Sequence, residues 1–392
     1  MRSHVRIAAV AGLGLSLTVA ATGLAQRAAT PPATSPGAAS DTTTRIVAAA
    51  QALVATLDDA GRAKVQFPFE GPQKTRWSNF PSGIFHREGL RLGDLTPAQR
   101  TAVNTLLSTA LSRDGYRKVT EIMRGDEVLR AGGGGPRGGP PAGGPPAGGP
   151  PGGGPPAGSP PGGASPAGGG GRGRGGPGGG GVVFGQDEYY LAFLGTPSTT
   201  APWMLQFGGH HLAINLTLAG SQASMAPSLP AAQPASYTFE GRTVRPLDNE
   251  NDKAFALINA LDDTQRKEAI LGSRVADLVL GPGQDGRTIQ PEGIRASSLS
   301  EAQQSMLVDL VREWAGIQND AFAGPRMAEI RTNLPQTYFA WSGPTTNGSA
   351  AYFRVQGPTL LIEYAPQGGG VDHIHTIYRD PTNDYGAKFT RK

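Results

Sequence analysis

The chain has 392 residues, no cysteine and a formal net charge of +4. The lack of cysteine excludes disulfides, thiol catalysis and cysteine-ligated metals, so any metal site must use histidine, carboxylate or amide ligands. The calculated isoelectric point of 9.4 suggests a nucleic-acid partner. However, five arginines at the N-terminus and in a glycine-rich tract have no acids beside them, and without these five the net charge is −1. We therefore expect no nucleic acid as a partner.

The N-terminus has the features of a cleavable export signal. Arg2 and Arg6 give it a basic start, an apolar run covers residues 7–20, and small residues follow. We predict a signal peptide at residues 1–25 and a linker at residues 26–43. The apolar run is shorter than the roughly 20 residues of a membrane span, and no later segment is longer. We expect an exported protein, periplasmic or extracellular, with no membrane span.

Residues 131–181 form a tract that is dominated by glycine and proline. Of its 51 residues, 27 are glycine and 13 are proline. Such a composition cannot bury enough apolar surface to fold, so we predict a disordered insertion. The repeat unit Gly-Gly-Pro-Pro-Ala has a period of five, which excludes a collagen triple helix with glycine at every third place.

The chain contains internal repeats on either side of this tract. A motif of the form Leu-x3-Leu-Asp-Asp-x2-Arg starts at Leu53 and again at Leu257, a shift of 204 residues. A helix-capping motif starts at Leu95 and again at Leu299, at the same shift. Two motifs in the same order with a constant offset indicate a duplicated unit.

The repeats continue after the tract with a different offset. The aromatic segment that starts at Tyr190 matches the one at Tyr338, a shift of 148 residues. The change of offset is close to the length of the tract, which therefore looks like an insertion into the first of two related halves. We predict a first half at residues 44–218, a linker at 219–240, and a second half at 241–392.

Each half is predicted to contain helices followed by antiparallel strands. Thr96 with Gln99, and Ser300 with Gln303, form capping boxes in front of apolar residues at helical spacing. Alternating aromatic and β-branched runs follow in both halves. The predicted fold class is α+β, with helices against antiparallel sheets and an approximate twofold axis between the halves.

Four of the six histidines lie in two short stretches that are far apart in the chain. His373 and His375 lie on a predicted strand that folds back antiparallel to the preceding one, so they share a face about 7 Å apart. His210 and His211 begin another predicted strand and would point to opposite faces. His211 is in line with small and polar residues and is the preferred partner, with His210 as the second candidate.

Imidazoles that converge from these stretches could hold a divalent metal ion. Three histidines and one carboxylate suit Zn²⁺, or Fe and Cu, with a position left open for water. Glu363 and Asp372 are the carboxylates nearest in the sequence pattern, and either could act as a ligand, a general base or an orienting group. The alternatives are a metal-free polar cleft and histidines with separate structural roles.

Arg379 and Asp384 lie in a segment that is dense in turn residues. They could bind an anionic group of a substrate. A turn closed by salt bridges is the favoured alternative, because the segment Asp-Pro-Thr-Asn-Asp-Tyr-Gly is typical of turns. The chain has no Gly-x-Ser-x-Gly elbow, no His-Glu-x-x-His motif and no phosphate-binding loop, which argues against the common hydrolase, zincin and nucleotide-dependent classes.

Several of these segments together resemble a known family. The segments are Trp77–Pro81, Leu95–Gln99, Pro202–Trp203 with Phe207–Asn215, and Asp372–His375 with Tyr378–Gly386. They look like the conserved blocks of an exported family catalogued as domain of unknown function 3500. The resemblance covers the chain from about Val47 to Gly386, and only the glycine–proline insertion departs from it. It supports the choice of the histidine segments and implies no reaction.

Three hypotheses for the function follow from these patterns. The first is an exported metal-dependent enzyme, hydrolase-like, with His211, His373 and His375 as ligands and Glu363 or Asp372 assisting. The second is a non-catalytic extracytoplasmic module that binds a metal or a small ligand between the halves. The third uses His373 or His375 as a general acid–base without metal. The pattern specifies neither the substrate nor the oligomeric state.

Overall fold

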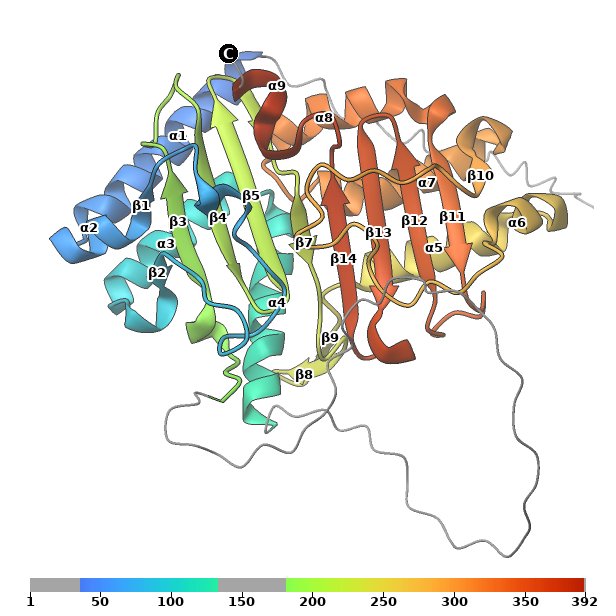
Figure 1. The fold of residues 1–392 in the computed structure, drawn as a ribbon, viewed down its shortest axis with the longest axis horizontal. Coiled ribbons are helices and arrows are strands. Elements are labelled where there is room, and N and C mark those ends of the chain that lie inside the picture. The colour runs from blue at the N-terminus through green and yellow to red at the C-terminus, as the bar shows by residue number, and fades with distance from the viewer. Residues whose placement is uncertain (1–35, 133–180, 391–392) are drawn as a thin grey trace, which may run out of the picture. The chain divides into compact units, whose positions relative to one another are not determined.

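A computed structural model describes residues 36–132 and 181–390 of the chain. The predicted signal peptide, residues 26–35 of the predicted linker and residues 133–180 of the tract lie outside the described residues. The described part is a mixed α+β structure with one large, mostly antiparallel sheet (Figure 1). None of its helices combines the length and the hydrophobicity that crossing a bilayer requires.

The sheet runs in the order β1-β3-β4-β5-β7-β14-β13-β12-β11-β10, with β2 beside β3 and β6 beside β5. All of its pairs are antiparallel except β1 with β3. A separate hairpin is formed by β8 and β9. The strands are β1 (Gln66–Phe67), β2 (Leu90–Arg91), β3 (Tyr190–Leu194), β4 (Trp203–Gly209), β5 (Leu212–Ala219), β6 (Gln222–Ser224), β7 (Ser228–Pro230), β8 (Tyr237–Phe239), β9 (Arg242–Val244), β10 (Ile294–Arg295), β11 (Tyr338–Ser342), β12 (Tyr352–Gly357), β13 (Leu360–Pro366) and β14 (Ile374–Arg379).

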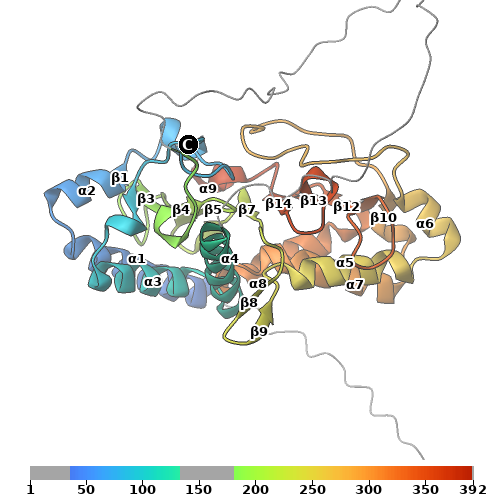
Figure 2. The ribbon, with the colours of Figure 1, turned by 90° about the horizontal axis from the view of Figure 1, so that it is seen from below.

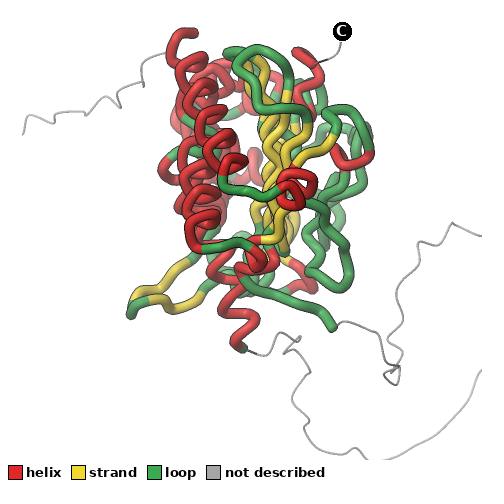
Figure 3. Tube along the Cα trace, turned by 90° about the vertical axis from the view of Figure 1, so that its left-hand side faces the viewer, coloured by secondary structure: helices red, strands yellow, loops and turns green. Residues whose placement is uncertain are grey.

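The long helices cover one face of this sheet, and loops cover the other (Figures 2 and 3). In the described residues the helices are α1 (Pro36–Ala55), α2 (Asp59–Val65), α3 (Pro97–Ala110), α4 (Arg113–Ala131), α5 (Asp248–Ala260), α6 (Asp263–Ala269), α7 (Glu301–Ala315), α8 (Asp320–Thr332) and α9 (Ala387–Thr390). Both predicted capping boxes are present, at the starts of α3 and α7. The prediction of an α+β fold is confirmed.

Two apolar clusters lie between helices and sheet, and a third lies under the loops. On β5, Leu212, Ile214 and Leu216 belong to the helix side, whereas Ala213 belongs to the loop side with Trp77. This alternation is the period of two that a strand imposes on side chains. The loop side of the sheet is therefore also buried, and its cover is provided by the segments around residues 71–89 and 271–289.

Two segments differ from the predicted linkers. Helix α1 begins at Pro36, inside the stretch predicted as a linker, because its alanines and Ile46 pack into the core. The second predicted linker, residues 219–240, contains β6, β7 and β8 and is largely buried. Strand β7 pairs with both β5 and β14, so it joins the two parts of the sheet. The alanine- and proline-rich composition of residues 219–240 gave no sequence signal for β7, which is a central strand of the sheet.

Candidate metal centre

His210 and His211 form the turn of the β4–β5 hairpin. Gly209 pairs with Leu212, so the two histidines are the only residues between the strands. The prediction that both lie on a strand is wrong, and the alternation rule does not apply to them. His211 has a left-handed backbone conformation with φ of 63°. Such a conformation is uncommon for a residue with a β-carbon and occurs most often where structure around it enforces it.

The start of β14 is brought to this turn by the chain that follows β7. The amide of Ala231 donates to the carbonyl oxygen of His211 over 2.8 Å, and Ala232 exchanges two backbone hydrogen bonds with Ile374, each of 2.9 Å. His373 and His375 flank Ile374, so both are held beside the hairpin turn. Residues separated by more than 160 positions in the chain thus meet through one short extended segment.

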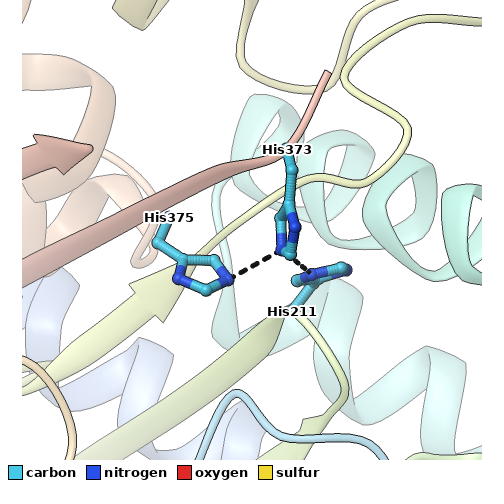
Figure 4. A group of neighbouring side chains, drawn as sticks. All are labelled: His211, His373 and His375. Carbon is cyan, nitrogen blue, oxygen red and sulfur yellow. Dashed lines mark hydrogen bonds between the residues drawn. The ribbon is translucent and has the colours of Figure 1, made fainter. Parts of the chain in front are cut away.

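The imidazoles of His211, His373 and His375 point toward one another (Figure 4). The Nε2 atoms of His211 and His373 are 3.0 Å apart, and those of His373 and His375 are also 3.0 Å apart. One ligating nitrogen from each residue lies within 4.8 Å of the other two. His373 and His375 share a face, as predicted. The group is a buried cluster that could hold a metal ion.

Asp126 of α4 fixes the orientation of His211 from behind. Its Oδ1 atom lies 3.0 Å from Nδ1 of His210 and 3.2 Å from Nδ1 of His211, and its Oδ2 atom lies 2.7 Å from the hydroxyl of Tyr189. Burial raises the pKa of Asp126, but the hydrogen bonds to the two histidines outweigh it and leave this pKa below its usual value. An ionised acceptor places the proton of His211 on Nδ1, which leaves a lone pair on Nε2.

The three Nε2 atoms cannot all be satisfied by protons. With a lone pair on His211, a proton on Nε2 of His373 can serve the contact with His211 or the contact with His375, but not both with good geometry. A cation accepts all three lone pairs at once. A histidine ligand whose other nitrogen donates to a carboxylate is the usual arrangement in zinc sites.

The charge state of the cluster also suits a cation. Burial, and then the neighbouring His210, lower the pKa of His211 well below its usual value. Burial, and then His375, lower the pKa of His373 to about 4. Both imidazoles are therefore neutral at neutral pH, and only neutral imidazole can act as a ligand.

His375 also has polar neighbours outside the three-histidine cluster. Oδ1 of Asp277 lies 3.9 Å from its Nδ1 atom, and the amide nitrogen of Asn79 lies 3.2 Å from both ring nitrogens. Asp277 resembles Asp126 in its placement behind a ligand, at a longer distance. Asn79 lies in the segment Trp77–Pro81 that carries the family resemblance, but neither Asp277 nor Asn79 belongs to a metal-ligand pattern in the sequence.

Asp126 was also missed, although the sequence contained a signal for it. In α4 the buried residues Lys118, Val119, Ile122 and Met123 recur at helical spacing, and Asp126 continues this stripe. A carboxylate on the buried stripe of an amphipathic helix needs a partner inside the protein. That partner is the pair of histidines in the hairpin turn.

His210 belongs to a second group, formed with Asp126 and His211. Its ring lies against that of His211, with centroids 3.5 Å apart, and against Phe184 at 4.9 Å. His211 contributes to both groups. The Nε2 atom of His211 faces His373, and its Nδ1 proton is donated in a hydrogen bond to Asp126. His210 therefore lies beside the three-histidine cluster and is not a member of it.

The two carboxylates predicted to assist lie outside both groups. Glu363 is fully buried on β13, where its oxygens accept hydrogen bonds from the amides of Val279 and Leu280 and from the hydroxyl of Tyr352. These hydrogen bonds anchor the loop that contains Val279 and Leu280, and they occupy both oxygens of Glu363. Asp372 is exposed beside His373 and accepts a hydrogen bond of 3.1 Å from the amide of Ala235.

Arg379 and Asp384 adopt the alternative that the turn-rich sequence favoured. Nη1 of Arg379 lies 2.9 Å from Asp384 and 3.0 Å from Asp285, and its other nitrogens donate to the carbonyl oxygens of Leu280 and Gly281. Its donors are taken up inside the protein. The structure therefore leaves no basis for the substrate-binding role considered for this pair.

The fold and the cluster define a class: a mixed α+β protein in which buried histidine and aspartate side chains could hold a metal ion. The chain belongs to the family described as "Protein of unknown function (DUF3500)", whose sequence profile matches residues 39–387. No curated protein and no solved structure matches the chain.

Proposed function

We propose that this protein is an exported, metal-dependent enzyme of a hydrolase-like type, with His211, His373 and His375 as the metal ligands. The observation that carries the proposal is the convergence of three Nε2 atoms, backed by a buried carboxylate. Structural zinc sites use four protein ligands, whereas catalytic sites use three and keep one position open. The group found here among the histidine, aspartate and glutamate side chains of the described residues has three members.

The burial of the ligands supports an open position on one side. His211 and His375 are 1% and 7% exposed, whereas His373 is only partly buried. A substrate would therefore approach beside His373. An ion held there would lower the pKa of a bound water and polarise a carbonyl or phosphoryl oxygen of a substrate. Asp126 and Asp277 would hold the ligands in place, and Asp372 is the exposed carboxylate nearest to this side in the chain.

The donor set narrows the choice of ion. Three imidazole ligands without a thiolate suit Zn²⁺, Fe or Cu and do not suit Mg²⁺ or Ca²⁺, which prefer oxygen ligands. We propose a transition metal of this group.

The test is a metal analysis of the full chain purified without a histidine tag. We expect about one ion per chain in the wild type and in His86→Ala, which removes an exposed histidine far from the cluster in the sequence and paired only with Glu88. His375→Ala should lose the ion. A wild-type protein that binds no Zn²⁺, Fe or Cu in solution would overturn the proposal and favour a metal-free role for the histidines.

A non-catalytic binding module is the second candidate, because a specific observation favours it. Asp126, the buried carboxylate behind His211, accepts hydrogen bonds from His210, His211 and Tyr189 through both of its oxygens, so it is not free to act as a base. Asp277 accepts hydrogen bonds from Leu278 and Gln367 through Oδ1, which leaves only its Oδ2 atom. Assays with a panel of esters, phosphoesters and glycosides distinguish the two candidates. Turnover that is lost when the metal is chelated would favour the enzyme over the binding module.

We also propose that the chain arose by duplication. The positions of equivalent elements support this: α2 and α6, β2 and β10, and the capping boxes of α3 and α7 are each displaced by 204 residues. The strand orders β3-β4-β5 and β11-β12-β13 agree as well. The metal ligands come from the hairpin of the first half and the last strand of the second.

A further inference from the structure

A buried arginine without an acidic partner lies next to the histidine hairpin. Arg87 is 8% exposed, and its Nη2 atom donates to the carbonyl oxygens of Ser78, Phe80 and Gly209 over 2.8, 2.6 and 2.6 Å. Its Nη1 atom is buried and has no hydrogen-bond partner in the described part of the chain. The Nη2 atom therefore holds the loop that contains Ser78 and Phe80 against Gly209, whereas Nη1 is without a protein partner among the described residues.

The charge of Arg87 is not neutralised by a neighbour. Every hydrogen bond of its guanidinium goes to a neutral carbonyl, and none of the ion pairs within residues 36–132 and 181–390 involves it. A buried charge is costly unless it is both hydrogen-bonded and paired. The protein provides the hydrogen bonds, whereas the nearby carboxylates Asp126 and Glu188 act on Arg87 only at a distance and are hydrogen-bonded to His210, His211 and Arg91. An anion that arrives from solution would supply a paired counter-charge.

Arg87 also lines a cavity that can admit a small group. The cavity has an empty volume of about 330 Å³, including its opening, and its walls include Trp77, Tyr190 and Gln206. Two charged side chains besides Arg87 reach it, and both are exposed: Arg76, which adds positive charge, and Glu88. Glu88 lies 3.3 Å from His86 and forms no ion pair with Arg87 among the described residues.

The cavity lies beside chain segments that also border the metal cluster. Gly209, whose carbonyl Arg87 binds, directly precedes the two histidines of the turn. Ser78, whose carbonyl Arg87 also binds, directly precedes Asn79, whose amide contacts His375. The guanidinium thus connects the two chain segments that border the cluster on this side. A ligand group at Arg87 would lie beside these two segments.

We propose that Arg87 forms an anion subsite beside the histidine centre, so that the substrate carries a carboxylate or a phosphate group. The two groups share the chemistry that a guanidinium reads, namely negatively charged oxygens that accept parallel hydrogen bonds. That the bound molecule is a substrate rests on the proposed function. The subsite itself depends only on Arg87 and the cavity.

The experiment separates the subsite from the metal. Full-length protein is freed of metal with a chelator, which is then removed, and is titrated calorimetrically with inorganic phosphate and with acetate at constant chloride. We expect the wild type and His375→Ala to bind one of the anions alike, and Arg87→Gln to bind it at least about tenfold more weakly. Arg87→Gln should still bind Zn²⁺ at the stoichiometry of the wild type, whereas His375→Ala should not.

The anion that binds more tightly identifies the group. If Arg87→Gln does not fold, Arg87→Lys provides the test, because it keeps the charge and loses the planar fork; weaker binding is then expected, and unchanged affinity would overturn the proposal. A wild type that binds neither anion would also overturn it, since a water molecule would then be sufficient partner for Nη1. Anion binding without Zn²⁺ binding would leave the subsite standing and remove the metal centre.

Discussion

Two hairpins of the sheet have the same construction and different chemistry. In β4–β5 a two-residue turn, His210–His211, lies between Gly209 and Leu212, and in β12–β13 the turn Pro358–Thr359 lies between Gly357 and Leu360. Each turn is contacted by a residue that lies fourteen positions after the N-cap of a helix, inside α4 in the first case and at the C-cap of α8 in the second. These residues are Asp126, after Ser112, and Asn333, after Asn319.

The side chains at these matching places do different things. Asp126 is an ionised carboxylate that accepts from two imidazoles. Asn333 is a neutral amide whose nitrogen lies 3.4 Å from the hydroxyl of Thr359, and Arg326 of α8 donates to the carbonyl oxygen of the same threonine. The second turn is held by hydrogen bonds to Thr359, without the carboxylate–imidazole contacts of the first turn. The comparison teaches that the fold provides a supported turn, and that carboxylate and imidazole convert one such turn into a ligand.

Exchanging one residue in each turn gives the largest expected difference. We expect His211→Ala to lose metal binding and Thr359→Ala to keep it, since only the first turn supplies a lone pair to the cluster. At a free Zn²⁺ concentration of 100 times Kd, binding should stabilise the wild type and Thr359→Ala by about 2.7 kcal/mol. Chemical denaturation with Zn²⁺ and with a chelator measures this, and an equal gain in His211→Ala would refute the assigned ligand.

The helix residues that support the turns provide the next test. Asp126→Asn keeps the size of the side chain but removes the charged acceptor that sets the His211 tautomer, so we expect a loss of roughly 10–100-fold in metal affinity. Asn333→Asp makes the reverse change in the second half and should leave metal affinity unchanged. Competition titrations with a chromogenic chelator give both affinities. If the two variants behave alike, Asp126 has no specific role in holding His211.

The sequence predicted the scaffold better than it predicted this site. Helical spacing and capping boxes depend on neighbouring residues, and α3 and α7 begin where Thr96 and Ser300 indicate. The strand that carries His375 does fold back antiparallel to β13, and His373, which lies one residue before β14, joins His375 in one cluster. These features are local, and local physics determines them.

The parts that could not be predicted depend on contacts between distant segments. The turn at His210–His211 has no glycine or asparagine to mark it, and the left-handed conformation of His211 is maintained by its surroundings. The approach of β14 to the turn depends on β7 and Ala231, in a segment whose composition indicates a linker. Asp126 comes from a helix 84 positions before His210. Such contacts exist only once the sheet has formed.

Adding a methyl group at the glycine before each turn tests how closely the turns are packed. A β-carbon at Gly209 would lie 2.8 Å from the ring of the buried Tyr189, and one at Gly357 would lie 2.6 Å from the hydroxyl of Thr337. We expect each alanine variant to lose about 1–3 kcal/mol of unfolding free energy, as is typical of overpacking. Only Gly209→Ala should also weaken metal binding, because Tyr189 contacts Asp126. Equal metal affinity in both variants would separate Tyr189 from the site.

The smallest expected effect is on the pH dependence of the metal-free protein. The pKa of His373 is lowered to about 4 in the folded state, first by burial and then by His375, whereas an unfolded histidine has a pKa of about 6.5. Between these values the unfolded chain binds more protons than the folded one, so the unfolding free energy decreases as the pH falls through this window. His373→Gln should show a shallower decrease. Thr359→Ala, whose turn has no titrating group, should keep the wild-type slope.

Denaturation curves in the presence of chelator, at several pH values between about 4 and 7, measure how the unfolding free energy depends on pH. Identical slopes in all three proteins would mean that His373 is not held neutral. The cluster would then lack the neutral His373 imidazole that it needs beside His211 to bind a cation.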